Sequence, residues 1–140
     1  MTTYESDIKT IRCSAEKAYS LFADLNNISK IKDKIPADKV QSLEFDTDSC
    51  SVAIDPLGKI TFVVENREPF ETIKFGAKES PVAFNLWIQF KEMAENDTRM
   101  KLTIKAELPM MIKAMFGSKI QDFLNSMAET IIISLNNNSL

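Results

Sequence analysis

The chain has 140 residues, of which 44% are hydrophobic and 26% charged, a composition typical of one globular domain and unlike that of a disordered segment. Its net charge is −3, and only three of its 17 basic residues are arginine, the side chain best suited to phosphate and guanine, so we expect no nucleic-acid partner. Histidine is absent, which excludes histidine-based nucleophilic or acid–base catalysis.

The amino-terminal third predicts one strand followed by two short helices. Weak alternation favours a strand over 4–12. Ser14 stands where a helix N-cap is expected, and Glu16 suits the positive end of the helix dipole. Apolar residues at helical spacing carry this helix to Leu25. A second apolar set predicts a shorter helix that ends before Pro36, with its apolar positions at Ile28, Ile31 and Ile35.

The middle of the chain predicts a succession of antiparallel strands joined by hairpin turns. Clusters of turn-forming residues at 46–49, 56–58, 68–69 and 96–97 separate the segments. Within each segment apolar and polar residues alternate, which is typical of a sheet with one buried and one solvated face. The expected strands cover 40–46, 50–54, 59–67, 73–77, 84–90 and 100–106.

The last segment, from Pro109 to about Leu135, predicts a long amphipathic helix whose apolar residues fall within an arc of roughly 140°. The apolar face of the sheet is the surface of matching size. Gly117 lies on the apolar side, where it indicates a kink, a close approach to the sheet, or an entrance to a pocket. Alternatively, 109–116 is a loop and the helix begins at Ser118.

Methionine is concentrated in the same part of the chain. Five of the seven methionines fall at or after Met100, and these are Met100, Met110, Met111, Met115 and Met127. Flexible, polarizable methionines suit either an adaptable pocket mouth or ordinary gap filling in a core.

The segment Ile11–Leu25, IRCSAEKAYSLFADL, together with this order of elements, resembles the START/Bet v 1-like superfamily, also called the SRPBCC or polyketide cyclase/dehydrase-like group. The matching positions are Ser14, Ala15, Glu16, Tyr19, Leu21, Phe22 and Asp24. Many relatives carry an aromatic residue soon after the aspartate, where this chain has Ile28-Ser29-Lys30. That departure leaves the subfamily open.

The resemblance implies an α+β helix-grip fold in a single domain, 1–140. In such a fold a curved antiparallel sheet of about seven strands wraps around a long C-terminal helix, with two short helices after the first strand. Members of the superfamily bind lipids, sterols, quinones, plant hormones or polyketides in a cavity between sheet and helix, and some catalyse cyclisation or dehydration.

The candidate ligand-binding residues are apolar positions of the expected strands and of the last helix. They are Phe62, Val64, Ile73, Phe75, Phe84, Leu86, Ile88, Met100, Leu102, Ile104, Phe116, Ile120, Phe123 and Met127. Ordinary core packing demands the same side chains, so the sequence does not separate cavity lining from core.

Three functions remain open at this stage. The first is binding or carriage of a small hydrophobic molecule, such as a lipid, a polyketide or a quinone-like compound. The second is a polyketide cyclase or dehydratase, in which an acidic group such as Glu65 or a phenol such as Tyr4 would do the acid–base work. The third is a protein-interaction module, including a homodimer, that uses the outer sheet face around Trp87.

We assign no catalytic residue, and we expect no metal and no cofactor. Cys13 and Cys50 lack the spacing of a metal or redox motif, and their small number favours a reducing, cytoplasmic compartment, although their pairing stays open. The amino terminus lacks the apolar core of a signal peptide, and no apolar run is long enough for a membrane span.

Overall fold

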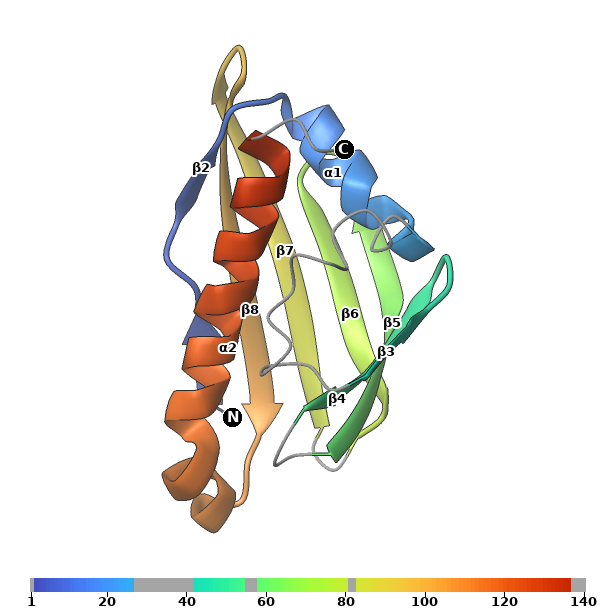
Figure 1. The fold of residues 1–140 in the computed structure, drawn as a ribbon, viewed down its shortest axis with the longest axis vertical. Helices are drawn as coiled ribbons and strands as arrows, with labels where there is room; N and C mark the ends of the chain where they lie inside the picture. Colours follow the sequence, from blue (N-terminus) through green and yellow to red (C-terminus); the bar gives the residue numbers. More distant parts are fainter. Residues whose placement is uncertain (1, 27–41, 55–57, 81–82, 137–140) are drawn as a thin grey trace.

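The computed structural model describes residues 2–26, 42–54, 58–80 and 83–136. Within these ranges a curved, unclosed antiparallel sheet carries two helices on its concave side (Figure 1). The strands are β1 (Thr2–Glu5), β2 (Lys9–Ile11), β3 (Ser42–Phe45), β4 (Ser49–Ile54), β5 (Gly58–Glu68), β6 (Thr72–Glu79), β7 (Ala83–Ala94) and β8 (Asp97–Glu107). The helices are α1 (Ala15–Ala23) and α2 (Met110–Asn136).

The strand order is β1-β8-β7-β6-β5-β4-β3, and β2 also pairs with β8. The first and last strands of the chain therefore meet, while β3 to β8 follow one another as hairpins. This arrangement confirms the helix-grip fold, and the described residues form eight strands where the sequence predicted about seven. The predicted second helix at 28–35 lies outside the described residues.

The predicted strand at 4–12 is interrupted, because Ser6 replaces a regular backbone pairing with its side chain. The Ser6 N–H donates to the Leu102 carbonyl at 2.9 Å, and the Ser6 hydroxyl accepts from the Leu102 N–H at 2.9 Å. Ser6 is buried, so both groups must be satisfied inside the protein. β1 and β2 consequently pair with the same strand on either side of this irregularity.

Helix α1 begins where the sequence predicted. The Ser14 hydroxyl accepts from the Lys17 N–H at 3.1 Å, and Glu16 lies in the first turn. The helix lies against β6 and β7, and its Phe22 ring stacks on Phe90 with ring centroids 6.4 Å apart. Burial of each such aromatic side chain contributes about 1.5–3 kcal/mol, so this contact anchors α1 on the sheet.

The predicted turns at 46–49 and 96–97 are confirmed by their local geometry. The Asp46 carboxylate accepts from the Asp48 N–H at 3.0 Å and the Ser49 N–H at 2.8 Å, and these hydrogen bonds lower the pKa of Asp46. Asn96 adopts a φ of 54° in the turn between β7 and β8, a left-handed conformation that asparagine tolerates better than most residues.

Candidate functional site

The concave face of the sheet is built from residues that pair directly across five neighbouring strands. Tyr4 pairs with Ile104, Ile104 with Leu86, Leu86 with Phe75, and Phe75 with Val64. Because side chains of directly paired residues point to the same side of a sheet, this row lies on one face. Tyr4 reaches Gly117 of α2, which shows that the row faces the helices.

The structure divides the candidate ligand-binding residues into two groups. Five are fully buried and form part of the core, namely Ile73, Phe75, Ile88, Met100 and Leu102. Eight others are only half-buried, namely Phe62, Val64, Phe84, Leu86, Ile104, Ile120, Phe123 and Met127. We call these eight the open apolar set. The side chain of Phe116 lies outside the described residues.

The eight side chains of the open apolar set are only partly buried, and α2 does not lie across the middle of the sheet. The helix runs beside β1, β2 and β8 at one edge of the concave face (Figure 1). Its buried residues Leu124, Ala128 and Ile131 lie on the stripe that packs against this edge. Phe123 and Met127 lie on the neighbouring stripe and are half-buried. Apolar side chains from the sheet and the helix thus remain partly open to solvent.

Gly117 marks a close approach between α2 and the sheet. A β-carbon at this position would lie 2.9 Å from the Tyr4 hydroxyl oxygen, closer than van der Waals contact allows. The alternative of a loop at 109–116 is wrong, since the Lys113 N–H already donates to the Pro109 carbonyl at 2.9 Å and the helix is continuous from Met110. Glycine therefore lets the phenol reach the helix backbone.

Of the two candidate acid–base residues, Tyr4 stands on the concave face and Glu65 on the outer face. The Glu65 carboxylate accepts from the Asn85 side-chain amide at 2.8 Å, lies 3.8 Å from the Lys74 ammonium and covers Gly76. Glu65 follows the inward-facing Val64 and covers Gly76, which follows the inward-facing Phe75 on β6, so alternation along the strand points Glu65 outward. A role for Glu65 in chemistry at the open apolar set is thereby excluded.

Trp87 lies on the outer face, as the alternation of β7 predicted. It is half-buried, and the ammonium groups of Lys74 and Lys105 lie 5.6 Å and 5.7 Å from its ring centroid. These are cation–π distances. Gln89 and Thr103 are joined beside it by a hydrogen bond of 2.9 Å. The two faces of β7 are thus chemically distinct.

Cys13 and Cys50 are both free and both buried. Desolvation raises the pKa of Cys13, and it raises the pKa of Cys50 to about 12. Because the thiolate is the reactive form, both groups are poor nucleophiles at neutral pH.

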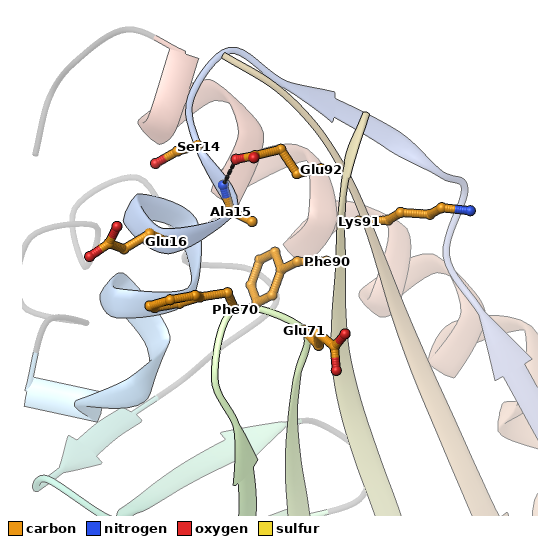
Figure 2. A pocket seen from close by; sticks show the side chains of 8 residues that line it. All are labelled: Ser14, Ala15, Glu16, Phe70, Glu71, Phe90, Lys91 and Glu92. Atoms are coloured by element: carbon orange, nitrogen blue, oxygen red, sulfur yellow. Dashed lines mark hydrogen bonds between the residues drawn. The ribbon is translucent and has the colours of Figure 1, made fainter. Parts of the chain in front are cut away.

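A surface hollow of about 490 Å³ lies between the start of α1 and the hairpins β5–β6 and β7–β8 (Figure 2). It was not predicted from the sequence, because five of its lining residues come from strands and turns far along the chain from α1. The lining comprises Ser14, Ala15, Glu16, Phe70, Glu71, Phe90, Lys91 and Glu92.

The amino terminus of α1 does not make this hollow an anion site. Two of the N–H groups in its first turn already have protein partners. The Ala15 N–H donates to the Glu92 carboxylate at 2.9 Å (Figure 2), and the Lys17 N–H donates to the Ser14 hydroxyl. Three carboxylates against one ammonium would further repel an anion.

Within the described ranges, no group of three acidic, cysteine or histidine residues has the geometry to hold a metal ion. In the same part of the chain, no helix has the length and apolar character needed to cross a membrane.

The sequence matches no family model and no curated protein. Solved structures are similar along the whole chain. A norcoclaurine synthase point mutant from Thalictrum flavum, in complex with a transition-state analogue, is 12% identical with a TM-score of 0.75, covering 100% of this chain and 99% of the other. A START superfamily protein from Mycobacterium smegmatis is 10% identical with a TM-score of 0.68, covering 97% and 98%.

This chain has the START/Bet v 1-like fold. A third structure, the Aha1 dimer from Colwellia psychrerythraea, is 17% identical with a TM-score of 0.64, and 97% of each chain is covered. At these identities the likeness shows the START/Bet v 1-like fold alone, and the resemblance seen in Ile11–Leu25 is confirmed at that level.

Proposed function

We propose that this chain binds and carries a small hydrophobic molecule, held by the open apolar set on the concave face. The observation that carries the proposal is the partial exposure of eight apolar side chains, five on the concave face of the sheet and three on α2. Each square ångström of apolar surface removed from water stabilises a complex by about 25 cal/mol, so a ligand covering these residues has a substantial driving force.

The charges on the concave face favour a neutral ligand. Arg67 is already engaged by the Ala23 carbonyl at 2.9 Å and by Asp48 at 2.7 Å, and Lys9 pairs with Glu129 at 3.0 Å. The Tyr4 hydroxyl adds a polar group beside the apolar row, where it can orient one oxygen of a ligand. A lipid, a polyketide or a quinone-like compound fits this chemistry.

The cytoplasm is the compartment we propose for this carrier. Its two cysteines are free and buried in the folded chain, a state that a reducing environment maintains.

Native mass spectrometry of gently purified protein tests the proposal directly. We expect a co-purified apolar molecule, or else a raised Tm in the presence of fatty alcohols or naphthoquinones, because a ligand that binds only the folded state stabilises it. Absence of any bound mass together with an unchanged Tm across both ligand classes would contradict carriage.

The location is tested with Leu86→Gln on the concave face and Lys105→Gln on the outer face as its matched control. Leu86→Gln should weaken binding on the order of tenfold, since it replaces apolar contact by an unpaired amide. Lys105→Gln should bind as the parent does. Equal affinities in both variants would show that the ligand lies elsewhere.

A further inference from the structure

The first two turns of α2 expose three large apolar side chains to solvent. Met110 is 87% exposed, Met111 74% and Met115 59%. This end of α2 projects past the end of β8 (Figure 1), in agreement with the high exposure of these side chains. We call Met110–Met115 the methionine tip.

The methionine tip presents its apolar residues on one side. At 100° per residue, Met110, Met111, Ala114 and Met115 fall within roughly 140° of the helix circumference. Helix formation does not require methionine at these positions, because glutamine and glutamate have similar propensity and are compatible with water. The apolar character of the tip therefore indicates contact with something outside the chain.

The methionine tip itself is positively charged, although the whole protein is not. Met110–Met115 contains Lys113 and no acidic residue, whereas the chain as a whole carries −3. The first turn of α2 also has no acidic residue, although the helix dipole favours a negative charge there. Lys113 borders the apolar arc, so the tip suits a partner that is apolar and anionic.

We propose that the methionine tip docks on an anionic lipid surface, with its methionines among the headgroups and Lys113 near the lipid phosphates. A lipid surface requires only a few side chains and added positive charge. A stable interface with a second copy requires roughly 20–30 residues a side and would bring the Lys113 side chains of both copies together. The proposal does not depend on ligand carriage, although docking would bring the open apolar set close to a lipid source.

Flotation with vesicles tests the proposal. We expect the full chain to float with vesicles of phosphatidylcholine and phosphatidylglycerol in equal parts, and to float less with phosphatidylcholine alone or in high salt, because salt screens Lys113. The triple variant Met110→Gln, Met111→Gln, Met115→Gln should lose at least about tenfold in vesicle affinity, since it removes the inserted apolar surface.

Met93→Gln is the matched control, because Met93 is 55% exposed and lies near the β7–β8 turn, away from the start of α2. It should float as the parent does, and all variants should share the parent's circular dichroism. Equal flotation of the triple variant and the parent would overturn the proposal. The proposal would also be overturned if the parent did not bind vesicles and instead formed a dimer, detected by light scattering, that the triple variant does not form.

Discussion

The Tyr4 phenol lies against α2 at Gly117, where the helix has no side chain. The phenol oxygen occupies the space a β-carbon at 117 would need, at 2.9 Å, whereas the ring carbon that bears it lies at 3.9 Å. Within a helix, alanine is more stable than glycine by about 1 kcal/mol. At position 117 this gain is offset by the cost of displacing the Tyr4 hydroxyl.

We therefore expect Gly117→Ala to leave the free energy of unfolding unchanged or lower it in the parent, and to raise it by about 1 kcal/mol in a Tyr4→Phe background. Urea denaturation of the four proteins of this double-mutant cycle measures the difference. Equal effects of Gly117→Ala in both backgrounds would show that the phenol does not constrain the helix.

The sequence predicted which residues form the concave face, but it did not predict two local details of the strands. Alternation placed the row Val64, Leu86 and Ile104 on the apolar face, and the structure agrees. Alternation alone could not settle which way Glu65 points, because the pairing of β5 with β6 shifts register between Val64 and Asn66, and it could not reveal the break at Ser6.

At the scale of elements, Arg67 joins three parts of the fold that are distant in sequence. Its guanidinium donates to the Ala23 carbonyl at the end of α1 and to Asp48 and the Thr47 carbonyl in the β3–β4 turn. Around it the Leu25 N–H donates to Thr47 and the Val64 N–H to Asp48. The guanidinium reaches these divergent acceptors from two separate nitrogens, whereas an ammonium group would have to reach all of them from one nitrogen.

Arg67→Lys should lower the free energy of unfolding by about 1–2 kcal/mol, because part of the half-buried hydrogen bonding is lost. Amide hydrogen exchange at Leu25 and Val64 should accelerate in the same variant, because the β3–β4 turn loosens. Arg99→Lys, which changes an exposed pair with Asp97 3.3 Å away, is the control and should stay within about 0.5 kcal/mol of the parent. Unchanged exchange at both amides would exclude a joining role for Arg67.

The elements themselves were largely predictable from the sequence. Ser14, the period-two run from Phe84 to Phe90 and the apolar stripe of α2 each carry a local signal. The tertiary contacts that hold separate elements together were not predictable. Those of Arg67 span 44 and 19 residues along the chain and depend on the curvature of the sheet. For the same reason the hollow beside Glu92 and Phe70 could not be foreseen.

At the scale of the whole molecule, the sheet separates an apolar face toward the helices from a charged outer face. Leu86 and Trp87 are neighbours on β7 that point to opposite sides. A ligand on the concave face would contact Leu86, whereas a protein partner on the outer face would contact Trp87. The wavelength of tryptophan emission therefore distinguishes carriage from the interaction-module alternative.

In the parent, whose one tryptophan is Trp87, a saturating fatty alcohol should leave the emission maximum unchanged. In the double variant Leu86→Trp, Trp87→Phe the same addition should shift the maximum to shorter wavelength, because the ligand removes water from a half-buried position on the concave face. Equal Tm values without ligand would confirm that both proteins are folded. A shift in the parent without one in the double variant would place the ligand on the outer face and refute carriage by the open apolar set.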